Sequence, residues 1–375
     1  MENSVTQEFP NQGRQLGIDL AKCLSISFMV IVHCLKQFGV DPNLPFFRYY
    51  DIIFGSILAA PVFMTAMGVG LAYSRRNSPI QFIYRGINIL ILGYLLEFVR
   101  VLPRFVIAGV NLDLELLFEA VFINSLGGDI LQFAGLALIL FGLLKFAKLK
   151  DYWILAIGVA LSLITTFVPL LVSNNIFLVN FVGLFAISVY VDTVTVAFPV
   201  LSWFIFVAFG YWYGNRLKNT HNTTRFHLLC GGIGAATSII GFTLAAIFGF
   251  GAVVATDDTA FYGMKIYDAI FCLGACIGFF ALCHFISLIS PKLLQKGYIN
   301  MSNALNLIYM IHWPIILYIS LPLEYYGIFL PLWSVLLIGF AIIITATFAG
   351  VSLKNHIKKK TTENPHSLWR YVNAG

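Results

Sequence analysis

Apolar runs of about twenty residues recur along the chain, and they limit its fold more than any other feature, because each is long enough to cross a bilayer as an α-helix. Hydrophobic residues make up 59% of the 375 residues and charged residues 11%. Soluble domains carry about 25% charged residues. We therefore predict an all-α integral membrane protein with about ten transmembrane helices around a central cavity. The predicted spans are 16–38, 52–73, 84–103, 129–147, 152–172, 198–214, 227–249, 266–289, 304–321 and 330–352.

The distribution of lysine and arginine between these runs predicts the orientation of the chain. With the N-terminus in the cytoplasm, eighteen of the 23 basic residues lie on the inner side, and an inner excess is typical of multi-pass proteins. We therefore expect both termini in the cytoplasm. The expected domains are an N-terminal tail over 1–15, without a cleaved leader, a membrane domain over 16–352 and a basic tail over 353–375. The five outer basic residues are Lys36, Arg48, Arg100, Arg104 and Lys265.

Two stretches do not fit simple spans. Residues 105–125 hold Asp113, Glu115 and Glu119 among apolar residues, which favours a helix lying at the outer surface. Residues 175–197 are apolar enough to enter the membrane, but a full span there would move the later basic residues outside. We expect an interfacial or re-entrant segment.

Composition also excludes several kinds of site and partner. The six cysteines are scattered and form no CxxC pair, so neither a disulfide framework nor a thiolate metal site is indicated, and no metal is expected. The net charge is +6, but the basic residues are separated by apolar spans. We therefore expect contact with membrane lipids and no binding of nucleic acid.

The first span carries a polar stripe of Asp19, Lys22, His33 and Lys36. Eleven residues separate Lys22 from His33, which is roughly three turns and ~16 Å, so both side chains share one helix face. Such groups are costly in hydrocarbon, so this face is expected to line a protein interior or a wet cavity. In the alternative reading, Asp19 pairs with Lys22 or both extend to the membrane surface, and His33 is a hydrogen-bonded packing residue.

Further polar residues are predicted to lie at a similar depth in the outer half. Glu97, Arg100 and Arg104 share one helix face, and Asp129 and Gln132 begin the fourth span. A histidine near them can act as a general base whose tautomer a carboxylate fixes, while the arginines hold an anionic or polyhydroxylated acceptor. The alternative is that Glu97 and Arg100 form only a local ion pair that anchors a helix end.

Two other groups of residues have a structural and a functional interpretation. Arg75, Arg76 and Arg85 flank the inner connection between the second and third spans. They either mark the topology or bind a diphosphate that enters from the cytoplasm. His312 lies in mid-span beside Pro314, where a histidine can satisfy a backbone carbonyl that the proline leaves free.

The order of these motifs resembles that of the membrane acyltransferase superfamily, which includes the acyltransferase-3 proteins and the relatives of heparan-alpha-glucosaminide N-acetyltransferase. Lys22 and His33 match the Arg/Lys-x10-His pattern of acyltransferase-3 proteins, in which the histidine is regarded as catalytic. The Arg-x-x-Arg motif of those proteins is absent, and Arg75, Arg76 and Arg85 are the nearest substitutes. The similar segments are RQLGIDLAKCLSISFMVIVH (14–33), APVFMTAMGVGLAYSRR (60–76), GDILQFAGLALIL (128–140), FPVLSWFIFVAFGYWYG (198–214) and NLIYMIHWPII (306–316).

The resemblance implies transfer of an acyl group, usually acetyl, from cytoplasmic acyl-CoA to a hydroxyl or amine of an extracytoplasmic glycan or small molecule. In that case His33 would be the catalytic residue, with Glu97 or Asp129 orienting it. The expected substrate-binding residues are Lys22, Lys36, Arg100, Arg104, Gln132 and His312, and Arg75, Arg76 and Arg85 would hold the phosphates of the donor.

Two other functions also fit the sequence. A charged stripe across the membrane also suits a secondary transporter or flippase for a polar or lipid-linked substrate, although no internal repeat is visible. A non-catalytic scaffold is the third interpretation, and it leaves the stripe unexplained. The expected location is a bacterial cytoplasmic membrane, with a homo-oligomer possible.

Overall fold

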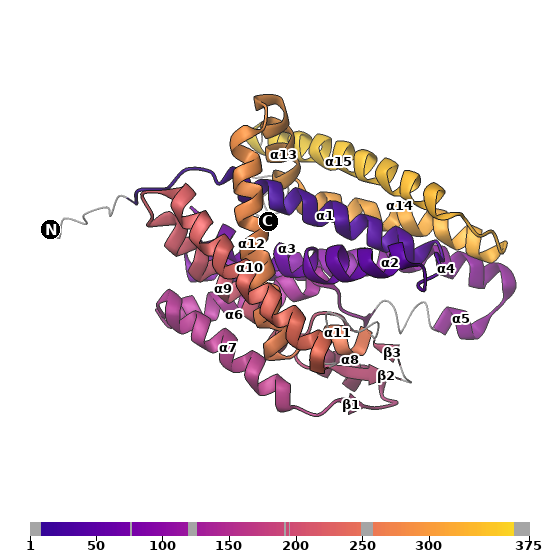
Figure 1. The fold of residues 1–375 in the computed structure, drawn as a ribbon. Helices are drawn as coiled ribbons and strands as arrows, with labels where there is room; N and C mark the ends of the chain where they lie inside the picture. Colours follow the sequence, from indigo (N-terminus) through magenta and orange to yellow (C-terminus); the bar gives the residue numbers. More distant parts are fainter. Residues whose placement is uncertain are drawn as a thin grey trace.

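The computed structural model describes residues 9–75, 77–118, 126–190, 193–194, 196–248 and 258–363, and these form a helical protein with one small sheet (Figure 1). The elements are α1 (Leu16–Gln37), α2 (Pro45–Tyr50), the π-helix η1 (Asp51–Ile57), α3 (Ala60–Ala72), α4 (Pro79–Asn111), α5 (Leu114–Phe118), α6 (Ile130–Phe146), α7 (Asp151–Phe167), β1 (Leu171–Val172), α8 (Ile176–Gly183), β2 (Ser188–Tyr190), β3 (Thr193–Val194), α9 (Val200–Lys218), α10 (Thr223–Phe248), α11 (Asp258–Tyr262), α12 (Ile266–Ile289), α13 (Lys292–Asn303), α14 (Leu305–Tyr325) and α15 (Leu332–Glu363).

Six helical segments within these described ranges are long and apolar enough to cross a membrane. The helical integral membrane class is therefore confirmed. Nine of the ten predicted spans each coincide with one helix, and 52–73 is divided between η1 and α3; because α4, α6, α7 and α9 are not among the six, the count of ten and the orientation stay predictions. The six segments are Leu16–Gln37, Pro45–Ala72, Thr223–Leu244, Ile266–Ile289, Leu305–Tyr325 and Leu332–Lys360.

Helix α1 lies at the centre and packs against α3, α12, α13, α14 and α15 (Figure 1). Beside it, α3 and α9 approach so closely that their backbones touch. A Cβ atom added to Gly68 would lie 2.2 Å from the carbonyl oxygen of Val207, and one on Gly210 would lie 2.0 Å from that of Thr65. Small residues permit this kind of contact between membrane helices.

The second predicted span, 52–73, is not one continuous helix. The π-helix ends at Ile57 and α3 begins at Ala60, with a short turn between them. The hydroxyl of Ser25 on α1 donates to the carbonyl of Leu58 at 2.8 Å, which satisfies a backbone group that the break leaves without a helical partner.

The two irregular stretches lie between helices. In the first, α4 continues through Pro103 to Asn111 and is followed by α5; Glu119 lies outside the described residues. In the second, α8 packs beside a sheet of order β1-β2-β3, with β1 and β2 parallel and β2 and β3 antiparallel. A bridge from Val196 to Gly128 joins this segment to the start of α6. Its interfacial or re-entrant position stays a prediction.

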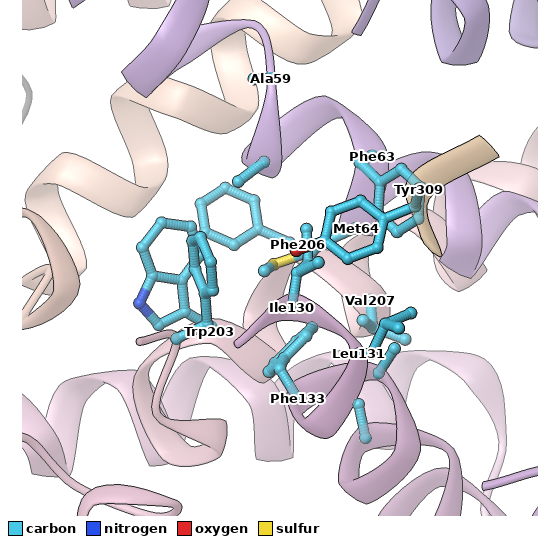
Figure 2. Close-up of a cluster of buried hydrophobic side chains, with 14 of the residues drawn as sticks. Ala59, Phe63, Met64, Ile130, Leu131, Phe133, Trp203, Phe206, Val207 and Tyr309 are labelled. Carbon is cyan, nitrogen blue, oxygen red and sulfur yellow. The ribbon is translucent and has the colours of Figure 1, made fainter. Parts of the chain in front are cut away.

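A buried cluster holds α3, α6, α9 and α14 together, and Figure 2 shows its centre. Met64 of α3 and Ile130 of α6 lie near Phe206 of α9. Tyr309 of α14 is 1% exposed and belongs to the same cluster, so the start of α6 and the middle of α14 are fixed relative to each other.

Candidate functional site

His33 lies against two neighbouring residues of α14. Its ring is 4.2 Å from the ring of Trp313, centroid to centroid, and it stacks on His312 at 5.6 Å with an interplanar angle of 15°. His33 is half-buried, and it makes no hydrogen bond within the described residues. The ring is therefore held by aromatic contacts, and no described residue bonds to its nitrogen atoms.

Arg100 contacts the other side chains of the site from α4. Its guanidinium carbon lies 4.0 Å from the centre of the Trp313 ring. Its Nη1 is 2.6 Å from a carboxylate oxygen of Glu97 and 3.1 Å from one of Asp129. Glu97 is 5% exposed, so this charge cluster is largely removed from solvent and is balanced by close pairing.

Asp129 connects this cluster to α14 and to the start of α6. Besides Arg100, its carboxylate accepts the Tyr309 hydroxyl at 2.7 Å, and that hydroxyl accepts the indole N–H of Trp313 at 3.1 Å. Asp129 is also the N-cap of α6, and Gln132 completes the capping box by accepting the Asp129 backbone N–H at 3.1 Å. The position of the carboxylate is thus fixed by the backbone.

The sequence predicted that Glu97 or Asp129 orients His33, and this role stays a prediction. Within the described residues neither Glu97 nor Asp129 bonds to the His33 ring; both hold Arg100. The physical reason is that Arg100 shares a helix with Glu97 and lies between it and Asp129, so the nearest cation takes both charges. Arg100 stacks on Trp313, and Trp313 contacts His33, so the carboxylates are linked to His33 through these two residues.

His312 is completely buried, and its Nδ1 lies 3.3 Å from the carbonyl oxygen of Ile308 one turn earlier. A carbonyl only accepts, so Nδ1 carries the proton. The carbonyl that Pro314 leaves free is that of Met310, four residues earlier, so this hydrogen bond to Ile308 is not the one expected beside the proline. The buried His312 ring contacts His33, and its predicted role in binding substrate stays a prediction.

Lys36, Arg104 and Gln132 are the remaining residues predicted to bind the substrate at this depth. The Lys36 ammonium is 3.5 Å from a carboxylate oxygen of Asp51. Arg104 lies on α4 next to Pro103 and is partly exposed. Gln132 is 1% exposed and is engaged in capping α6, so it stabilises the site from within rather than lining it.

At the N-terminal end of α1, Asp19 does not pair with Lys22. It is bound by Arg14 and by the hydroxyl of Ser302 at 2.6 Å, and Arg14 also donates to Asn303 at 3.0 Å. These bonds fasten the start of α1 to α13.

Lys22 is half-buried and has neither a hydrogen bond nor an ion pair in the part of the chain that the structure describes. Between it and His33 on the same face lie Ile26, 0% exposed, and Met29, 6% exposed. The polar stripe is therefore closed in the middle by two apolar side chains.

The inner arginines are only partly described. Arg75 is exposed just beyond α3, and Arg85 is partly buried on α4. Arg76 lies outside the described residues.

Sequence reasoning did not identify Tyr309 and Trp313 as site residues. A signal was present, because the two residues are four apart in one apolar span and therefore share a face, and each carries a polar group that needs a partner when buried. Across the described ranges, no group of three or more histidine, cysteine, aspartate or glutamate residues is arranged to hold a metal ion.

Comparison with known proteins assigns the family. A family model described as an acyltransferase domain matches residues 15–351. No curated protein and no solved structure matches the chain. The matched region includes His33, the Arg100 cluster and Lys22, and it covers nearly the whole membrane domain. The chain therefore belongs to the acyltransferase-3 family of membrane acyltransferases.

Proposed function

We propose that the protein transfers an acyl group, most simply acetyl, from cytoplasmic acyl-CoA to a hydroxyl or amine of an extracytoplasmic glycan or related acceptor. The observation that carries this proposal is His33, a histidine in a membrane helix whose ring nitrogens have no protein partner among the described residues and whose ring lies beside a paired charge cluster. An unengaged imidazole is what general-base catalysis of acyl transfer requires.

In this mechanism the acceptor oxygen or nitrogen attacks the thioester carbonyl carbon while His33 takes its proton. The carbon–sulfur bond breaks, its electron pair leaves with the sulfur of CoA, and the proton passes from His33 to that thiolate. A variant of the same reaction forms an acyl-imidazole on His33 first, which the acceptor then attacks.

The face of Trp313 lies beside the imidazole that this step protonates. An aromatic face stabilises a nearby cation. We therefore assign Glu97 and Asp129 the role of holding Arg100 and Trp313, and through them His33. Three of the five N–H groups of Arg100 have no partner among the described residues and would bind the acceptor.

The remaining polar residues are assigned by their depth in the membrane. Arg100, Arg104 and Lys36 would bind the acceptor at the outer side, and Arg75, Arg76 and Arg85 would meet the donor phosphates at the inner side. This assignment uses ten spans with both termini in the cytoplasm, one acyltransferase domain over 16–352, and a bacterial cytoplasmic membrane. Lys22 lines the route of the donor.

The test is acyl transfer by the purified protein in liposomes, measured as release of the CoA thiol from acetyl-CoA, with total envelope glycan as acceptor. We expect His33→Ala to abolish transfer. The matched control is His221→Ala, because His221 lies exposed in the loop before α10. If the His33→Ala variant transfers acyl groups at the parental rate, the mechanism is refuted.

A secondary transporter is the rival function, since a polar stripe also suits a solute pathway. The same assay separates the two, because a transporter moves its substrate without consuming a thioester. Rapid quenching with radiolabelled acetyl-CoA separates the two chemical routes, since only the acyl-imidazole route labels the protein.

A further inference from the structure

The side-chain position of Gly70 on α3 opens toward Lys22. A Cβ atom added to Gly70 would have a single neighbour within 4 Å, the Lys22 ammonium at 4.0 Å, and Gly70 itself is exposed. Since open space begins where a side chain would stand, the ammonium borders a region that the protein leaves unfilled.

The packing of α3 does not account for this glycine. Two residues earlier, Gly68 is needed for packing, because its Cβ atom would meet the Val207 carbonyl at 2.2 Å. Gly70 has no such contact, and glycine in a helix interior destabilises the helix relative to alanine. The glycine at position 70 keeps space open beside a cation rather than bringing two helices together.

The Lys22 ammonium needs a negatively charged partner. Asp19, the nearest carboxylate along α1, is already bound by Arg14 and Ser302. A lysine in a membrane-spanning helix that forms no ion pair with a described residue is costly, and such residues mark binding sites or pathways for ions and substrates. The enclosed side chains of Ile26 and Met29 on the same face show that this stripe faces protein rather than lipid.

We propose that the space between Gly70 and the Lys22 ammonium is an anion subsite that takes the diphosphate of the acyl donor. This inference rests on the proposed function for the identity of the donor. Lysine binds phosphate as a point charge, and removing the side chain at position 70 lets a bulky diphosphate approach it. Arg75, beyond the end of the same helix, would meet the phosphates before Lys22 does.

The distance to His33 agrees with the length of the donor. Lys22 and His33 are eleven residues apart, or ~16 Å along the helix axis. About thirteen covalent bonds separate the diphosphate phosphorus from the thioester sulfur of acyl-CoA, and at ~1.2 Å per bond of extended chain this arm also spans ~16 Å. A diphosphate held at Lys22 therefore brings the thioester to His33. The arm would pass Ile26 and Met29, and the flexible Met29 side chain is the easier of the two to displace.

A size series at position 70 tests the subsite. We expect Gly70→Ala, Gly70→Val and Gly70→Leu to fold and to weaken CoA binding progressively, measured by calorimetry in detergent. Gly70→Leu and Lys22→Gln should each raise Kd by about tenfold or more, and Lys22→Arg should restore part of the affinity. The control is Gly232→Leu on α10, another helical glycine with nothing within 4 Å of its side-chain position.

A donor without phosphates gives the sharper comparison. S-acetyl-pantetheine has the same thioester arm as acetyl-CoA and no diphosphate, so Lys22→Gln should slow its consumption by a much smaller factor than it slows the consumption of acetyl-CoA. Equal slowing with the two donors would overturn the assignment of Lys22 to the diphosphate. Unchanged CoA affinity in Gly70→Leu would overturn the subsite itself.

These outcomes separate the subsite from the proposed function. If CoA binding is lost in the variants but the parental protein transfers no acyl group, the subsite stands and the acyltransferase function falls. If the parental protein transfers acyl groups and the variants keep their KM for acetyl-CoA, the function stands and the subsite falls. If the parental protein does not bind CoA, both are overturned.

Discussion

The hydroxyl of Tyr309 joins the carboxylate of Asp129 to the indole of Trp313, so Tyr309→Phe tests whether the charge cluster acts on His33 through Trp313. The hydroxyl donates at 2.7 Å and accepts at 3.1 Å. The substitution keeps the ring, which packs in the core, and removes only the oxygen. We expect the variant to fold, to bind CoA normally and to transfer acyl groups more slowly.

Two losses determine the magnitude. A buried hydrogen bond to a charged group contributes about 1.5–3 kcal/mol, and a buried N–H left without a partner costs about 1–3 kcal/mol. The free energy of unfolding should therefore fall by about 3 kcal/mol. Only the loosened Trp313 indole affects catalysis. If it raises the activation free energy of acyl transfer by about 1 kcal/mol, transfer slows roughly fivefold.

A double-mutant cycle isolates this effect on transfer. Trp313→Phe removes the same N–H group from the other side, so the double variant should transfer acyl groups about as fast as the slower single variant. The assay is the rate constant for acyl transfer at saturating acetyl-CoA in liposomes. Trp203→Phe is the matched control, because it removes an indole bond to the Tyr262 carbonyl, 2.9 Å long, outside the site.

Two results would refute this reasoning. One is that the single substitutions slow transfer by factors that multiply in the double variant, which means that hydroxyl and indole act independently. The other is that Trp203→Phe slows transfer as much as Trp313→Phe, which means that any lost indole bond has the same effect.

Three further changes have defined outcomes. Arg100→Lys should slow transfer by about tenfold with little change in KM for acetyl-CoA, because lysine cannot pair with both carboxylates and stack on Trp313; an unchanged rate contradicts the role given to Arg100. Asp19→Asn should lower the free energy of unfolding by about 1–3 kcal/mol, because it weakens the link from α1 to α13, and CoA affinity should stay the same. A large loss of CoA binding would show that Asp19 belongs to the donor site. Met29→Trp should block transfer while leaving CoA bound, since the indole fills the route between Lys22 and His33; transfer at the parental rate would place the donor arm elsewhere.

The helical class follows from the sequence because it depends on local composition, and so does the Glu97–Arg100 pair, whose residues are three apart on one helix. The contact of His33 with Trp313 does not follow, because it joins residues 280 positions apart and depends on how α1 and α14 pack. The sequence placed His33, Arg100 and Asp129 at one depth, but depth alone does not say which charge takes which partner.

The break in the second span was not predicted. Residues 52–73 are mostly apolar, but Pro61, in the first turn of α3, is a local signal for a helix start. The hydrogen bond to the broken backbone comes from a distant residue, Ser25 of α1. The separation of Asp19 from Lys22 has the same origin, because Ser302 is far along the chain.

The apolar pair that closes the stripe on α1 has a consequence for the cell as well as for the reaction. A protein that is polar at both ends of one membrane helix is a potential leak for protons and ions, driven by the voltage across the membrane. Ile26 and Met29 are almost completely enclosed, so the two polar ends are electrically insulated from each other when no donor arm lies between them. Replacing either with a small polar residue would convert a group-transfer protein into an ion conductor, and the first sign would be loss of the membrane potential.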